Sequence, residues 1–79
     1  MGGKFEGKVK ITEELLFDEE FIAELKRRRE TLGVSATRFA RMLGLRPHWV
    51  LRVEQGKDYL ARKPYYLVKR YLRALGFDE

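Results

Sequence analysis

The first residues of the chain alternate between apolar and polar side chains. Phe5, Gly7, Val9 and Ile11 fall on one side of an extended segment, with charged residues between them. A period of two residues predicts a β-strand with one buried face. No second strand is evident in the sequence, so the backbone of this strand needs a partner, and a second copy of the chain is the simplest one. Phe5, Val9 and Ile11 are therefore candidate contacts with a second copy or another protein. The alternative is a flexible arm.

From Asp18 onward the apolar residues recur with the period of an α-helix. Turn and cap residues divide this part into four predicted helices, over residues 19–32, 36–43, 47–55 and 64–75. Asp18 and Ser35 are residue types that cap helix N-termini, and a glycine follows each of the four helices. The pattern predicts an all-α fold, in which a four-helix domain over residues 18–79 follows an extension over residues 1–17 that contains the strand.

Length and composition limit what else the chain can be. Seventy-nine residues make one domain with a small core, which a disulfide, a metal or a partner chain would have to supplement. With no cysteine and one histidine, neither a disulfide nor a structural zinc site is expected, and no cofactor is implied. A partner chain becomes the favoured supplement. No signal peptide or membrane segment is evident, so we expect a cytoplasmic protein. Asparagine is absent and 37% of residues are charged, a composition similar to that of thermophile proteins.

The charge is distributed unevenly along the chain. The net charge is +5, but residues 1–25 carry three basic and seven acidic groups, a net −4. Residues 26–79 carry fourteen basic and five acidic groups, a net +9. A compact segment with this charge favours a polyanionic partner, although a solvated basic surface explains the charge equally well.

The stretch SATRFARMLGLRPHWVLRVEQG, residues 35–56, has the spacing that two helices joined by a tight turn require. Ala40 is small where the helices would cross, and Gly44 stands where the chain must turn. Leu45, Val50 and Val53 would attach the third helix to the first two. The opposite face of the third helix carries hydrogen-bonding side chains, of the kind that read base edges or bind phosphates: Arg46, His48, Arg52 and Gln55.

This stretch resembles the lambda-repressor-like (Xre) helix-turn-helix. The resemblance rests on Leu43-Gly44-Leu45 and on Glu54-Gln55-Gly56 at the family's spacing, and it extends from about Phe21 to Gly76. It implies that the third helix lies in the major groove of double-stranded DNA. The residues that it places near the bases are Arg46, Pro47, His48, Arg52 and Gln55. Those that it places near phosphates are Ser35, Thr37, Arg38, Trp49 and Lys57, with packing on the helix as an equal alternative for Trp49.

The resemblance implies a sequence-specific transcriptional regulator, in the first place a repressor, that binds an inverted repeat as a dimer. Three features depart from the family pattern. Ala36 replaces a frequent glutamine, Leu51 replaces a frequent serine, and the fifth helix that the family has after the fourth is missing. Glu54 is interpreted as a fold residue that bonds to the helix over residues 36–43 or to its loop, because an acid near phosphates is unfavourable.

Two alternatives to a DNA-binding regulator are an enzyme and a domain that mainly binds another protein. An enzyme is not expected, because the sequence contains no nucleophile–base pair, no phosphate-binding glycine loop and no cluster of metal ligands. The second alternative is a domain whose main partner is a protein: an antitoxin that adds its N-terminal strand to a toxin sheet, or an accessory factor of the phage or plasmid type that contacts polymerase. The acidic N-terminal quarter and Leu51 fit this alternative.

Overall fold

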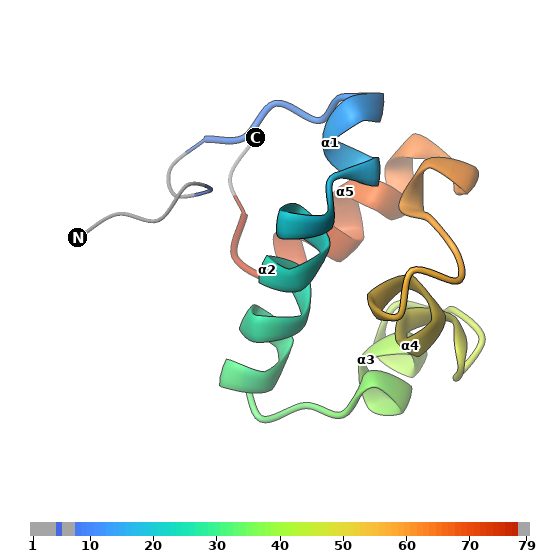
Figure 1. Ribbon diagram of the computed structural model, residues 1–79. Helices are drawn as coiled ribbons and strands as arrows, with labels where there is room; N and C mark the ends of the chain where they lie inside the picture. The colour runs from blue at the N-terminus through green and yellow to red at the C-terminus, as the bar shows by residue number, and fades with distance from the viewer. Residues whose placement is uncertain (1–4, 6–7, 78–79) are drawn as a thin grey trace.

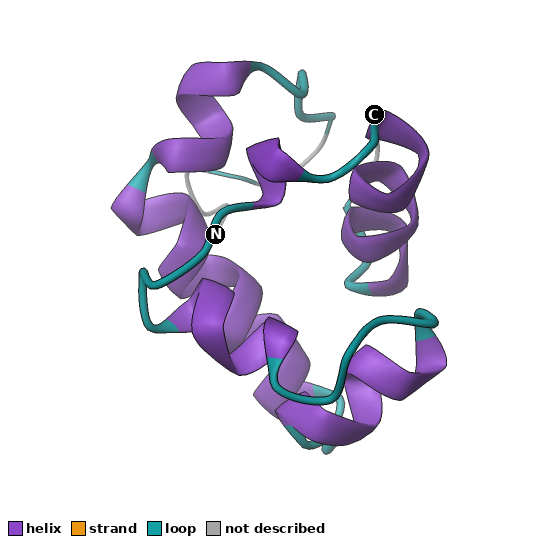
Figure 2. Ribbon diagram, turned by 90° about the vertical axis from the view of Figure 1, so that its right-hand side faces the viewer, coloured by secondary structure: helices purple, strands orange, loops and turns teal. Residues whose placement is uncertain are grey.

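The predicted helices are present in the computed structural model, which describes Phe5 and residues 8–77, and they are accompanied by two shorter ones (Figure 1). The described part contains the following elements: α1 (Glu13–Phe17), α2 (Glu19–Thr31), α3 (Ala36–Met42), α4 (Trp49–Glu54), the 3₁₀-helix η1 (Leu60–Arg62) and α5 (Tyr65–Ala74). Short loops join them, as Figure 2 shows. The all-α prediction is confirmed, with five α-helices rather than four in the described residues.

The predicted N-terminal strand is not confirmed in the residues that the structure describes. Apart from a single bridge position at Lys8, Phe5 and residues 8–12 form no strand; residues 6 and 7 of the prediction lie outside the described part. Phe5, Val9 and Ile11 instead pack partly buried against the helical core. The alternation of apolar residues therefore marks the side of this segment that faces the helices, and it does not require a neighbouring strand.

Helix α1 was not predicted, because its five residues are too few to show a helical period. Thr12 caps it, since its Oγ accepts a hydrogen bond from the Leu15 backbone N–H at 3.1 Å. Glu13 and Glu14 occupy its first turn, where the helix dipole favours acids. Leu16 is buried in the core. Thr12 and the two glutamates are a cap signal that could have predicted this helix.

The core lies between α2, α3, α4 and α5. Its central side chains are less than 2% exposed: Phe21, Leu25, Phe39, Val50, Val53, Leu60 and Tyr71. The Tyr71 ring on α5 meets Phe39 of α3 edge-on at a centroid distance of 5.2 Å, and Trp49 of α4 at 6.1 Å. One residue of α5 thus packs against both helices of the predicted helix-turn-helix and sets their position relative to the rest of the core.

Arg28 on α2 connects segments from both ends of the chain. Its Nη1 donates to the Leu75 carbonyl and its Nη2 to the Phe5 carbonyl, both at 3.3 Å. The guanidinium also lies 3.7 Å from the centre of the Phe77 ring. The rings of Phe5 and Phe77 lie 5.2 and 5.1 Å from that of Phe21. The N-terminal segment is therefore fixed to the same core as the C-terminal end of α5.

Candidate nucleic-acid interface

Helices α3 and α4 and the turn between them form the unit that the sequence predicted as a helix-turn-helix (Figure 1). Ser35 caps α3 by accepting a hydrogen bond from the Arg38 backbone N–H at 3.1 Å. The Leu45 N–H donates to the Ala40 carbonyl at 2.8 Å and closes the turn. Ala40 is fully buried, and Gly44 has a φ of +73°, which side-chain-bearing residues rarely adopt. Both residues therefore act as the spacing predicted.

Helix α4 presents one face to the core and the other to solvent. Trp49, Val50 and Val53 are buried, whereas Arg52 and Gln55 are exposed and Leu51 is 43% exposed. The helix begins at Trp49, two residues later than predicted, so Pro47 and His48 lie in the turn that leads into it. His48 is exposed and Pro47 is half-buried. Base-reading candidates thus come from the preceding loop and turn as well as from the helix.

Arg52 is held at the C-terminal end of α4. Its Nη2 donates to the Lys57 carbonyl at 3.4 Å, and the Lys57 N–H donates to the Arg52 carbonyl at 2.8 Å. This single long side-chain contact leaves most of the five N–H donors of the guanidinium available to a ligand. The two cations predicted for different roles, Arg52 and Lys57, therefore lie at one end of the same helix.

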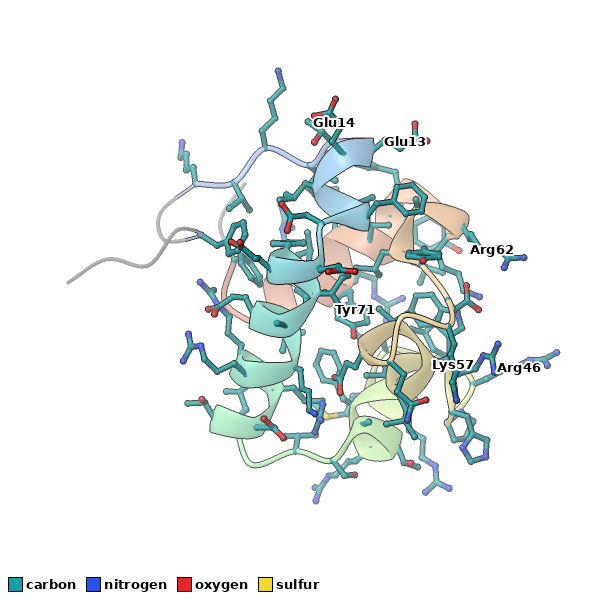
Figure 3. All side chains as sticks on the ribbon, in the orientation of Figure 1. Glu13, Glu14, Arg46, Lys57, Arg62 and Tyr71 are labelled. Atoms are coloured by element: carbon teal, nitrogen blue, oxygen red, sulfur yellow. The ribbon has the colours of Figure 1, made fainter. Side chains whose placement is uncertain are left out.

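Three cations from three segments extend on the same side of the molecule in Figure 3: Arg46 from the loop before α4, Lys57 from the loop after it, and Arg62 from η1. The side chain of Arg62 is 72% exposed and approaches Asp58 only at 3.7 Å. Arg62 was not among the predicted site residues. The basic composition of residues 57–63 was the signal that could have identified it.

The phosphate-contact candidates fall into two groups. Ser35, Thr37, Arg38 and Lys57 are exposed at the edges of the helix-turn-helix, although the Ser35 hydroxyl already caps α3. Trp49 is only 7% exposed, and the Lys63 Nζ lies 5.0 Å from the centre of its ring. Burial of Trp49 supports the packing alternative, and Lys63 is the cation that covers it.

The orientation of α4 is maintained by a buried ion pair. Arg29 of α2 donates from Nε to Glu54 Oε2 at 2.7 Å and from Nη2 to Glu54 Oε1 at 2.9 Å. The side chains are 10% and 2% exposed. Arg29 also donates from Nη1 to the Val34 carbonyl at 2.6 Å, in the loop before α3. Glu54 is thus a fold residue, as predicted, but its partner lies on α2 rather than on α3 or its loop.

The electrostatic effects of this pair extend into the core. The hydrogen bonds that Arg29 donates to Glu54 raise the pKa of Arg29 above its usual value. Burial, and then the negative charge of Glu54, raise the pKa of the Tyr71 hydroxyl well above its usual value. Within the described part of the chain, that hydroxyl has no hydrogen-bond partner. Tyr71 therefore acts as a neutral packing residue, and the charges here serve the fold.

The residues predicted to contact a partner chain have different environments. Phe5 faces inward, with its ring on Phe21 and its carbonyl bonded to Arg28. Val9 and Ile11 are half-buried, whereas the neighbouring residues Lys8 and Lys10 are exposed. Phe5 therefore contributes to the fold of its own chain, whereas the segment around Ile11 is partly exposed to solvent.

Comparison with models of protein families assigns most of the chain to one family. A family model described as a helix-turn-helix domain matches residues 20–79. No curated protein and no solved structure matches significantly. Within the part of the chain that the structure describes, no helix is long and apolar enough to cross a membrane.

Proposed function

The chain belongs to the family of helix-turn-helix domains, and from that premise we propose that it is a sequence-specific transcriptional regulator of the lambda-repressor-like kind that reads DNA with α4. The observation that carries the proposal is the two-sided character of α4. Its inner residues are buried, and its outer face and flanking loops display Arg46, His48, Arg52 and Gln55. These side chains supply the donors and acceptors that base edges require.

The expected division of roles follows from position. Arg52 is the principal base-reading residue, because arginine can donate two hydrogen bonds to guanine O6 and N7. Lys57, Arg62 and Arg38 are exposed cations around α4, and they contact phosphates, which fix the register without reading sequence. Arg46, Pro47 and His48 enter the groove beside α4, and Gln55 lies at its edge.

A single domain of this size reads few base pairs, so we propose that two copies bind an inverted repeat. The half-sites then lie about 10 base pairs apart, centre to centre, or at a multiple of that distance. Repression is the expected outcome when such a site overlaps a promoter.

The test compares Arg52→Ala with Lys57→Ala in DNA binding at several salt concentrations. Arg52→Ala is expected to remove about 1–3 kcal/mol of discrimination at one base pair of each half-site. Lys57→Ala is expected to weaken binding to all sequences alike and to reduce the slope of log K against log salt by about 0.9 for each phosphate that the lysine neutralises.

Arg73→Ala is the matched control, because it removes an exposed cation from the last turn of α5. It should change neither the sequence preference nor the slope by a comparable amount. A change of sequence preference in the Lys57 variant, with none in the Arg52 variant, would show that the two roles are assigned wrongly.

A further inference from the structure

The N-terminal segment and α1 create a groove that lies outside the predicted DNA-reading surface. A hollow of about 320 Å³ opens between residues 11–13, α1, η1 and the start of α5. Neighbouring hollows share Ile11 and Tyr65 with it on one side, and Thr12 and Glu13 on the other. We call this continuous surface the α1 groove. Residues 8–17, which form one side of it, precede the part of the chain that matches the helix-turn-helix family.

The α1 groove combines exposed apolar surface with backbone groups that have no hydrogen-bond partner among the residues that the structure describes. Ile11 is half-buried along it, and Tyr65 and Phe17 at its margins are 54% and 44% exposed. Within the described part of the chain, the backbone of residues 10–11 makes no hydrogen bond. Exposed aromatic surface beside unpaired backbone is typical of a contact site for another chain.

Charge indicates which chain fits. Exposed Lys8 and Lys10 lie on one side of Ile11, and exposed Glu13 and Glu14 lie on the other. A uniformly acidic or basic partner would be attracted to one end of this surface and repelled by the other. A second copy related by a two-fold axis near Ile11 brings the lysines of each chain to the glutamates of its mate.

The position of the groove suits this arrangement. In Figure 3 Glu13 and Glu14 lie at one end of the molecule, away from Arg46 and Lys57 beside α4. A mate bound at the α1 groove therefore leaves the outer face of α4 uncovered.

We propose that the α1 groove is the surface through which two copies of this chain associate. Tyr65 and Ile11 form the apolar centre, and the pairing of Lys8 and Lys10 with Glu13 and Glu14 sets the orientation. This inference extends the proposed binding to an inverted repeat, since it names the surface that creates the dimer.

The test uses two neighbouring tyrosines in the first turn of α5. Tyr65 lines the groove, whereas Tyr66 is 63% exposed and is not among the lining residues. Glutamate is favourable in the first turn of a helix, so Tyr65→Glu and Tyr66→Glu should both fold, which circular dichroism checks. By sedimentation equilibrium, Tyr65→Glu is expected to weaken self-association by about tenfold or more, and Tyr66→Glu by less than about twofold.

A charge exchange tests the orientation. Lys10→Glu and Glu13→Lys should each weaken the dimer, and the double variant should recover most of the loss. A chain that is monomeric at about 1 mM would overturn the inference, as would a dimer that is indifferent to Tyr65→Glu and to the charge changes.

Failure of this inference can be distinguished from failure of the proposed function. If the wild-type chain is monomeric in solution but two copies still bind the inverted repeat with sequence preference, the inference alone fails. If it forms the Tyr65-dependent dimer but binds no DNA sequence selectively, the proposed function alone fails.

Discussion

At the scale of single residues, Glu24 shows how the dense charge of α2 is arranged. Its carboxylate accepts hydrogen bonds from Arg27 Nε and Nη2 at 2.8 and 2.6 Å, and from Arg28 Nε at 2.8 Å. The hydrogen bonds from Arg27, with those from Arg28 and the positive charges of both residues, lower the pKa of Glu24 to about 2, against the opposing effect of burial. The same carboxylate orients Arg28 toward Phe5 and Phe77.

This low pKa predicts a pH dependence of stability. The folded-state pKa lies below the unfolded value of 4.5, so the stabilisation is complete above pH 4.5 and is lost as the pH falls toward 2. Glu24→Gln is expected to flatten the fall in the free energy of unfolding between these limits, as measured by chemical denaturation. Glu30→Gln, an exposed change on the same helix, should retain the wild-type pH profile. An unchanged profile in the Glu24 variant would contradict the assignment.

The sequence predicted individual roles well where a single residue determines them. Gly44 stands where the turn needs a positive φ, Ala40 is buried where the helices cross, and Ser35 caps α3. Roles that depend on distant residues were less accessible. The partner of Glu54 lies 25 residues away, and the burial of Trp49 depends on Tyr71 of another helix.

At the scale of elements, the Arg29–Glu54 pair joins α4 to α2. Removing one partner leaves the other charge buried without compensation, which typically costs about 3–5 kcal/mol. Glu54→Leu and Arg29→Met are each expected to lower the free energy of unfolding by an amount of that order. The double variant should be less destabilised than the sum of the two, because no buried charge remains.

Chemical denaturation of the four proteins measures this coupling. Additive effects would mean that the two side chains stabilise the fold separately. Arg62→Lys is a suitable control. The ion pair of Arg62 with Asp58 should contribute little to the free energy of unfolding, because the Arg62 side chain is 72% exposed.

The elements at the N-terminus show how little a short hydrophobic pattern reveals about what covers it. Helix α1 is too short for a 3.6-residue period to be visible, and only its cap and first-turn acids mark it. The alternation over residues 5–11 was real, but helices rather than another strand cover the apolar side. A period reports which side is buried and does not report what buries it.

At the scale of the whole molecule, the arrangement of α2 to α5 follows from strong local signals: caps, glycines at the turns, and a continuous apolar face on each helix. These signals made the helix-turn-helix predictable, and the family match over residues 20–79 confirms it. The α1 groove was not predictable, because it arises where residues 8–17 meet η1 and α5. Arg28 helps to hold the N-terminal segment in place, because it donates hydrogen bonds to the carbonyls of Phe5 and Leu75, which lie 23 and 47 residues away in the sequence.

We propose that the outer face of α4 reads a DNA sequence as part of a dimer. The decisive measurement is selection from random double-stranded DNA by the purified chain at about 150 mM salt. We expect an enriched inverted repeat with half-sites about 10 base pairs apart or a multiple of that distance, and loss of one preferred base pair per half-site with Arg52→Ala. Weak, salt-sensitive binding without any enriched sequence would show that α4 does not read a DNA sequence, and it would favour another protein as the main partner.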